Sequence, residues 1–184
     1  MTAVDTGSGQ RRILLAPNLG RPEIVATVAQ VVQACGRHGI AVRMLEDSSG
    51  HVAGGIEVET VPDTPEAAEG CELVLVLGGD GTFLRACQYA NAADVPVLGV
   101  NLGHIGFLAE SEVASLSGVV EQIASRDYRV VDRMTVEATV IHGDTVLGHG
   151  WALNEVSIEK VSRQGVLEAA VQNVGCLVSD YGCD

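Results

Sequence analysis

The stretch that most constrains the fold runs from Cys71 to Leu84 and reads CELVLVLGGDGTFL. Leu73 to Leu77 is an unbroken aliphatic run, which is typical of a strand buried on both faces of a parallel sheet. The run ends at Gly78-Gly79-Asp80-Gly81, and the apolar residues that follow have the spacing of a helix packed on the sheet. We therefore expect a strand, a glycine turn and a helix in direct succession.

The glycine turn has the properties of a phosphate-binding loop. The first N–H groups of a helix lack partners within the helix and favour anions, and glycines let phosphate approach the backbone. Asp80 stands between the glycines, and a carboxylate there repels phosphate unless it holds a metal ion or accepts a proton. The stretch matches neither a P-loop nor the dinucleotide fingerprint. A kinase-like site is thus indicated, and a tight turn without a ligand is the alternative.

Composition limits the partners of the chain. Its 184 residues carry a formal net charge of −13, which argues against nucleic acid and anionic membranes and implies a divalent cation wherever phosphate binds. Hydrophobic residues make up 47% and aromatic residues only 3%, so the core must be aliphatic. The five cysteines contain no CxxC pair, and we interpret them as reduced thiols. We expect a soluble, cytoplasmic protein without a signal segment or membrane span.

Strands and helices are expected to alternate through residue 132. Short apolar runs predict four further strands, at 13–16, 40–45, 56–61 and 95–100. Helices are predicted to begin at Pro22 and after the caps Thr64 and Ser111, and 48–55 is interpreted as a loop. This order predicts an α/β fold with a doubly wound, Rossmann-like parallel sheet. Ligands bind beyond the carboxyl ends of such strands, where the GGDG turn and a second glycine loop at 99–108 fall.

A second domain is expected after residue 132, because the apolar period changes to two. This period predicts an antiparallel hairpin that turns at Gly143-Asp144 and returns over 145–160, and another hairpin over 165–181. We therefore divide the chain into an α/β phosphate-binding domain, 1–132, and a partial antiparallel all-β domain, 133–184. In the returning strand the apolar residues switch from odd to even positions at Asn154-Glu155, and so from one face of the strand to the other. A β-bulge that points both side chains into a ligand cleft would explain this change, and a strand covered on its other face at one end is the alternative.

Three motifs in order resemble the NAD kinase family. GGDGTFLRA is similar to a signature of NAD kinases, diacylglycerol and sphingosine kinases and phosphofructokinases. LGVNLGHIGFLAE is similar to a block of NAD kinases that the lipid kinases and phosphofructokinases do not carry in this form. WALNEVSIEK resembles the Asn-Glu motif of the family, and the closing YGCD resembles the start of its next block. The resemblance covers residues 12–184 and is strongest to actinobacterial NAD kinases, a branch in which inorganic polyphosphate can replace ATP.

The resemblance implies a reaction and the residues that perform it. NAD would be phosphorylated on the 2′-hydroxyl of its adenosine ribose to give NADP, with ATP or polyphosphate as donor. Mg²⁺ or another divalent cation would be held mainly by the phosphates of the donor, with Asp80 as the one candidate ligand from the protein and no dedicated metal site. Asp80 would accept the hydroxyl proton, and Gly81 would lie against the dinucleotide. Arg85 would bring positive charge near phosphate, with a solvated helix position as its alternative. The remaining nucleotide contacts would come from Asn154, Glu155 and Asp184.

The Gly-Ser-Thr-Ala-Tyr loop and the remaining β domain of the family have no counterpart in this sequence. We therefore expect a truncated NAD kinase that has little or no activity by itself and that forms a homo-oligomer at full length. One alternative is a non-catalytic remnant that binds nucleotides or forms oligomers. Another is a lipid-kinase-like catalytic domain, which the GVNLGHIGFL block and the acidic charge disfavour.

Overall fold

The structure is a computed structural model that describes residues 9–49, 58–101, 111–112, 116–159 and 165–183. Its internal contacts divide the chain into two units, residues 1–131 and 132–184. The division into domains at residue 132 stays a prediction, because contacts within a unit do not show that it folds alone.

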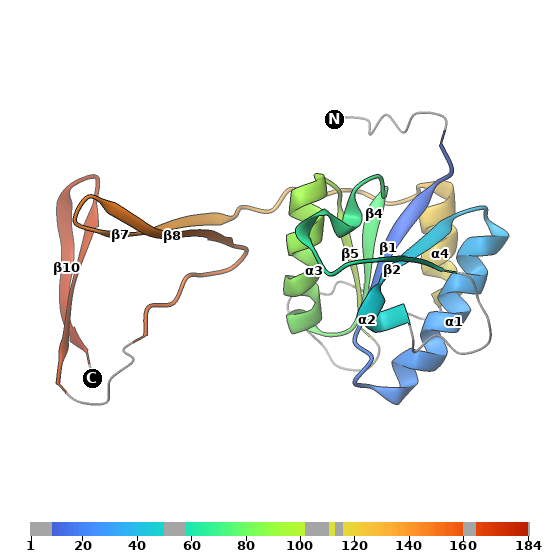
Figure 1. The fold of residues 1–184 in the computed structure, drawn as a ribbon, viewed down its shortest axis with the longest axis horizontal. Coiled ribbons are helices and arrows are strands. Elements are labelled where there is room, and N and C mark those ends of the chain that lie inside the picture. Colours follow the sequence, from blue (N-terminus) through green and yellow to red (C-terminus); the bar gives the residue numbers. More distant parts are fainter. Residues whose placement is uncertain (1–8, 50–57, 102–110, 113–115, 160–164, 184) are drawn as a thin grey trace. The chain divides into compact units, whose positions relative to one another are not determined.

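The N-terminal unit contains a parallel sheet of six strands in the order β3-β2-β1-β4-β5-β6 (Figure 1). The strands are β1 (Arg12–Pro17), β2 (Ala41–Leu45), β3 (Glu59–Val61), β4 (Leu73–Leu77), β5 (Val97–Asn101) and β6 (Ser111–Glu112). The helices are α1 (Pro22–Arg37), α2 (Glu46–Ser49), the 3-10 helix η1 (Pro65–Ala68), α3 (Asp80–Ala93) and α4 (Leu116–Ser125). Neighbouring strands pair in parallel throughout. The predicted doubly wound α/β fold is therefore confirmed.

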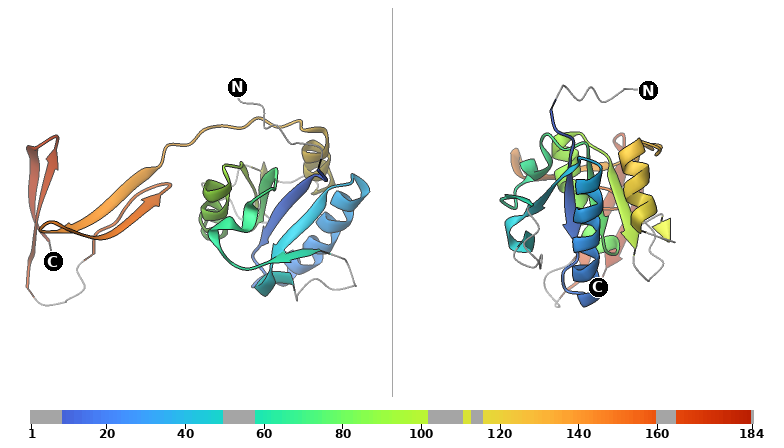
Figure 2. Two further views of the ribbon diagram at one scale, coloured as in Figure 1. Left: turned by 45° about the horizontal axis from the view of Figure 1, so that its top comes forward. Right: turned by 90° about the vertical axis from the view of Figure 1, so that its right-hand side faces the viewer.

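Helices cover both faces of this sheet. Successive strand residues point to opposite faces, so β4 contributes side chains to two separate cores. On one face Leu73, Leu75 and Leu77 of β4 belong to a core shared with α1 and α4. On the other face Val74 and Val76 belong to a core shared with α3 and η1. In the left view of Figure 2, the green α3 and the blue α1 flank the sheet. All five residues of β4 are at most 1% exposed, as the aliphatic run predicts for a central strand.

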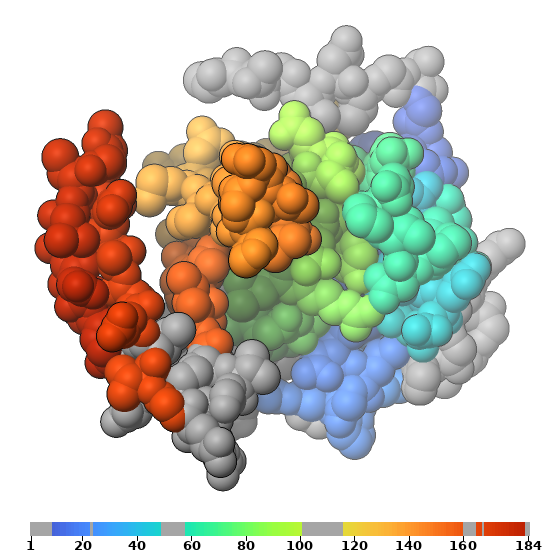
Figure 3. Space-filling model, turned by 60° about the vertical axis from the view of Figure 1, so that its left-hand side comes forward, coloured from blue at the N-terminus to red at the C-terminus, as the bar shows by residue number. Residues whose placement is uncertain are grey.

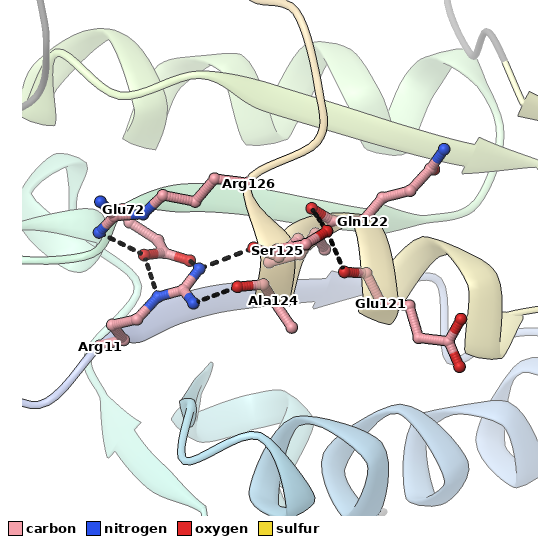
Figure 4. Close-up of polar contacts among 8 residues, drawn as sticks. Arg11, Glu72, Glu121, Gln122, Ala124, Ser125 and Arg126 are labelled. Atoms are coloured by element: carbon pink, nitrogen blue, oxygen red, sulfur yellow. Dashed lines mark hydrogen bonds and ion pairs between the residues drawn. The ribbon is translucent and has the colours of Figure 1, made fainter.

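An ion pair between Arg11 and the buried Glu72 connects α4 to the start of β4. Glu72, which precedes β4, is 6% exposed and accepts hydrogen bonds from Nε and Nη2 of Arg11 at 2.8 and 2.7 Å. Arg11 also donates to the backbone oxygens of Ile123 and Ala124, at 2.7 and 2.6 Å (Figure 4). The last carbonyls of a helix lack intrahelical partners. Arg11 therefore caps α4 while it neutralises Glu72.

The edge strand β3 is held in place by Arg43 of β2. Its Nη2 lies 2.7 Å from Oε1 of Glu59 in β3, and this hydrogen-bonded arginine lowers the pKa of the Glu59 carboxyl. Nη1 of Arg43 donates to the backbone oxygens of Ala67 and Glu69, at 3.1 and 2.6 Å. One arginine thus links β2 to the whole segment that runs from β3 through η1.

Two local predictions in the N-terminal unit are wrong. Ser111 does not cap a helix, because it pairs with Val100 as part of β6, and α4 begins only at Leu116. The predicted loop at 48–55 begins within α2, whose acidic residues Glu46 and Asp47 suit a first helical turn. Thr64 occupies the predicted N-cap position of η1, although its side chain makes no capping bond. Residues 50–55 of that loop lie outside the described residues.

The C-terminal unit consists of two antiparallel hairpins among its described residues, as the period of two predicts. The first pairs β7 (Val136–His142) with β8 (Thr145–Ala152), and the second pairs β9 (Leu167–Asn173) with β10 (Cys176–Cys183). Figure 3 draws the first hairpin in orange and the second in red. The antiparallel β character expected for this part of the chain is confirmed.

The predicted bulge at Asn154-Glu155 is wrong. β8 ends at Ala152, so both residues follow the strand and take no part in its pairing. The register of the first hairpin shifts instead between Val140 and Ile141. The change in apolar parity after Leu153 therefore marks the end of the strand, where side chains no longer have to alternate.

Replacement of Glu72 tests the ion pair that holds α4. Glu72→Gln keeps the size of the side chain but leaves the Arg11 guanidinium without its buried counter-charge. We expect the free energy of unfolding to fall by about 2 to 3 kcal/mol, less than for a fully buried pair because Arg11 is partly exposed. The described helices all lie in the N-terminal unit, so urea denaturation followed by circular dichroism at the helical band measures it. The control Glu121→Gln changes an exposed carboxyl, and equal losses for both variants would contradict this role.

Candidate active site

The candidate site lies where neighbouring parallel strands of the N-terminal unit end. β1, β4 and β5 are adjacent and parallel, so their carboxyl ends meet at one edge of the sheet. The backbone N–H of Asn18 donates to the oxygen of Leu77 at 2.8 Å, and that of Gly78 donates to the oxygen of Val100 at 3.1 Å. These bonds place the residues that follow β1 directly beside the turn at Gly78–Gly81.

Close packing explains the first glycine of the turn. A Cβ atom on Gly78 would lie 2.8 Å from Oγ1 of Thr82 and 3.1 Å from Cβ of Asn18. Gly79 and Gly81 differ, because a Cβ on either would meet no described atom beyond its chain neighbours and its own helix backbone within 4 Å. Packing therefore favours glycine at position 78, whereas Gly79 and Gly81 leave open space on either side of Asp80.

Asp80 is the first residue of α3, and its side chain is half-buried. Gly79 precedes it in an extended conformation, and the Gly79 oxygen accepts from the N–H groups of Thr82 and Phe83 at 3.0 and 3.1 Å. Asp80 and Gly81 thus belong to the first helical turn, whose leading amides face the carboxyl edge of the sheet. The helix dipole stabilises a negative charge at this position, whether it belongs to Asp80 or to a ligand.

Arg85 forms an ion pair that the sequence analysis did not anticipate. Its Nη2 contacts Oδ2 of Asp63, and its Nε donates to the hydroxyl of Tyr89 at 3.2 Å. The Tyr89 hydroxyl donates in turn to Oδ1 of Asp63. The bond from Tyr89 and the Arg85 guanidinium lower the pKa of the Asp63 carboxyl, while burial and the bond to Asp63 raise the pKa of Tyr89. Arg85 is thus paired within the chain while 60% of its side chain stays exposed, and its role beside phosphate remains a prediction.

The structure brings only part of the predicted site together. Asp80, Gly81 and Arg85 share the first two turns of α3. Asn154 and Glu155 belong to the C-terminal unit, where both are exposed. Asp184 and most of the second glycine loop, 102–110, lie outside the described residues. A cleft shared by Asp80 with Asn154 and Glu155 therefore remains a prediction.

Metal and membrane features are limited among the described residues. There, no three or more His, Cys, Asp and Glu side chains gather in a way that could hold a metal ion. None of the described helices combines the length and apolar character that a membrane crossing requires.

Comparison with known families identifies the fold. Residues 13–128 match the family model described as the ATP-NAD kinase N-terminal domain. The chain belongs to the NAD kinase family. It is 50% identical over 186 residues to a protein named NAD kinase from Mycolicibacterium paratuberculosis, with 95% of this chain and 60% of that protein covered. It is 46% identical to the NAD kinase of Rhodococcus erythropolis, with 100% and 62% covered.

The chain therefore spans about 60% of the length of these curated relatives. Among solved structures, it resembles a yeast NADH kinase complexed with NADH, with a TM-score of 0.81 and 16% identity. That match covers 95% of this chain and 53% of the yeast chain, and at this identity it supports the fold alone. The resemblance inferred from three sequence motifs is thus confirmed at the level of the family.

A methyl group on Gly78 tests the packing that forms the turn. We expect Gly78→Ala to lower the free energy of unfolding by about 1 to 3 kcal/mol, because the new Cβ would press on Thr82 and Asn18. The control is Gly36→Ala in α1, where a Cβ meets no described atom within 4 Å outside its own helix. There the better helix propensity of alanine should raise stability slightly. Urea denaturation of both variants measures the difference, and a neutral Gly78→Ala would contradict the proposed packing.

Proposed function

We propose that the chain carries the catalytic carboxylate of an NAD kinase, which transfers a phosphoryl group to the 2′-hydroxyl of the adenosine ribose of NAD and so forms NADP. The observation that supports this function most is the position of Asp80. It is the first residue of a helix that begins at the carboxyl edge of a parallel sheet, between two glycines with open space beside them. Membership of the NAD kinase family supplies the reaction class.

In the proposed mechanism Asp80 acts as the general base. A sugar hydroxyl is a weak nucleophile at neutral pH, and a positioned carboxylate takes its proton as the phosphoryl group arrives. The 2′-oxygen then forms a bond to the terminal phosphorus of the donor, while the bond from that phosphorus to the bridging oxygen breaks. The leaving group is ADP when ATP is the donor, or a shortened chain when polyphosphate is the donor. The first amides of α3 stabilise the negative charge of the phosphates.

The remaining residues are proposed to bind the two substrates. Gly81 gives the dinucleotide room beside Asp80, since no side chain occupies that space. Arg85 lies five residues further along α3 and supplies positive charge toward phosphate. We assign the adenine and ribose contacts to Asn154, Glu155 and Asp184, following the family motifs that these residues match.

A divalent cation such as Mg²⁺ fits this donor set as a partner of the phosphates. Mg²⁺ keeps several waters and is usually bound through one or two carboxylates together with substrate phosphates. Asp80 supplies one such carboxylate, and the described residues offer no larger cluster. The cation would neutralise phosphate charge during transfer, which an acidic chain with a net charge of −13 cannot do by itself.

The proposal also covers the cellular location and the oligomeric state of the enzyme. Cys35, Cys71, Cys87 and Cys176 are free thiols, which supports a reducing, cytoplasmic location. The first hairpin exposes Val140 at 59% and Leu147 at 66%, and the second exposes Leu177 at 63%. Apolar surface of this kind supports assembly into a homo-oligomer.

The same exposed surface favours one competing function. A chain that binds nucleotides or assembles without catalysing transfer would present such hairpins as well, and the relatives extend well beyond the matched length. The two functions differ because only the kinase would convert NAD to NADP. The family match disfavours the third possibility, a lipid kinase.

A chimera tests the kinase function. This chain would be extended with the segment of the Mycolicibacterium paratuberculosis relative that lies beyond the match, and NADP formation would be followed by a coupled assay with Mg²⁺ and ATP or polyphosphate. We expect turnover by the chimera and little or none by the 184 residues alone. Asp80→Asn in the chimera should lower kcat about 100- to 10,000-fold, because it removes the general base.

The control for this substitution is Asp94→Asn, at the exposed C-terminal end of the same helix. It removes the same charge and should leave kcat within about twofold of the parent, because this charge is exposed and remote from the reacting atoms. An active Asp80→Asn chimera would rule out the proposed base. A chimera that folds and binds NAD without turnover would favour the non-catalytic function.

Gly81→Ala separates ligand contact from folding. Alanine is favoured over glycine in a helix by about 0.5 to 1 kcal/mol, and the space at Gly81 is open, so stability should not fall. If the dinucleotide lies against Gly81, the new methyl group should weaken NAD binding by about fivefold or more. Calorimetric titration of the chimera with NAD measures this change, with Gly36→Ala as the control. Unchanged affinity would contradict the assignment of Gly81.

A further inference from the structure

Asp63, Arg85 and Tyr89 form a closed polar cluster between α3 and the segment that joins β3 to η1. Arg85 contacts both Asp63 and Tyr89, and Tyr89 donates its hydroxyl proton to Asp63. Asp63 lies two residues after β3, in the segment that Arg43 ties to β2. The aspartate is therefore presented to α3 by an anchored part of the fold.

The three members of this cluster differ in how firmly they are held. Tyr89 is 3% exposed and packs in the core between α3, η1 and the sheet. The side chains of Asp63 and Arg85 are 38% and 60% exposed. An ion pair this open to water is weak and readily exchanged for another anion. The hydrogen bond from Tyr89, in contrast, remains available to Asp63 after Arg85 leaves.

Arg85 lies within reach of an anion at the start of α3. Gly81 precedes it by four residues, which places both on one face of α3, about 6 Å apart along the helix axis. Helical side chains also lean toward the N-terminus, so an extended arginine covers much of that distance. A terminal phosphate carries more charge than a carboxylate and accepts two parallel hydrogen bonds from a guanidinium. Phosphate at this helix end is thus a stronger partner for Arg85 than Asp63 is.

We propose that Asp63 is an internal competitor for Arg85, which holds the guanidinium in the absence of ligand and releases it to a phosphate of the phosphoryl donor. This inference rests on the proposed function, because it assigns Arg85 to that phosphate. Tyr89 makes the exchange possible by keeping a hydrogen bond to the carboxylate that Arg85 leaves behind. Asp63 thereby lowers the affinity for the donor, since only the fraction of molecules with Arg85 released binds it fully.

A double-mutant cycle in the 184-residue chain tests this competition. The probe is inorganic tripolyphosphate, titrated by calorimetry at low salt, where the interaction of exposed charges is least screened. Asp63→Asn keeps the size of the side chain and still accepts a hydrogen bond from Tyr89. It should bind tripolyphosphate about two- to fivefold more tightly than the parent chain, the change that corresponds to loss of an exposed ion pair. Arg85→Gln should bind it more weakly.

The double variant separates competition from a general charge effect. If Asp63 acts through Arg85, Asp63→Asn should bring no gain in the Arg85→Gln background. Glu66→Gln removes one charge from an exposed site three residues away and serves as the control. It should change the affinity less than Asp63→Asn does. Thermal unfolding of every variant, and a second substitution, Asp63→Ser, ensure that a folding defect is not mistaken for the effect.

Two results would overturn the inference. One is an equal effect of Asp63→Asn and Glu66→Gln, or an undiminished gain in the Arg85→Gln background. The other is the absence of tripolyphosphate binding in all variants. Either result would leave the cluster with a structural role alone, as a link between the β3–η1 segment and α3. An active chimera with no coupling between Asp63 and Arg85 would sink this inference alone, whereas clear coupling with an inactive chimera would sink the kinase function alone.

Discussion

The complete burial of β4 is the constraint from which the candidate site follows. Helices cover β4 on both faces, so the chain turns away only at the carboxyl end of the strand. It turns there at Gly78, which packs closely against the side chains of Asn18 and Thr82. That tight exit sets the start of α3 and places Asp80 at its first residue. The open space at Gly79 and Gly81 is then available to a ligand because the rest of the turn is already fixed by packing.

The fold of the N-terminal unit was largely predictable because its signals are local. Leu73 to Leu77 has the pattern of a central strand, and Pro22 marks the first position of α1, as the structure bears out. Predictions that depended on distant partners were weaker. Ser111 has the composition of a helix cap, but pairing with Val100 converts it to a strand. The parity change near Asn154 arises from the end of β8, which the pattern alone did not distinguish from a bulge.

The candidate site was predictable only where it is contiguous in sequence. Asp80 and its glycines form one motif, whereas strand order brings Asn18 beside the turn and the packing of η1 on α3 brings Asp63 to Arg85. Arg85 illustrates the difference. Its sequence position indicates a basic residue near phosphate, but its pairing with Asp63, 22 residues away, depends on the tertiary fold. In an acidic chain, such an arginine acquires an internal carboxylate partner before any ligand arrives.

The central claim is that the Asp80 carboxylate takes the proton of the ribose hydroxyl. A crystal structure of the chimera with NAD bound tests it most directly. We expect a carboxylate oxygen of Asp80 within about 2.6 to 3.2 Å of the 2′-oxygen of the adenosine ribose, with the dinucleotide against Gly81. NAD bound with its adenosine ribose beyond the reach of Asp80, at a site formed by other residues, would contradict the account.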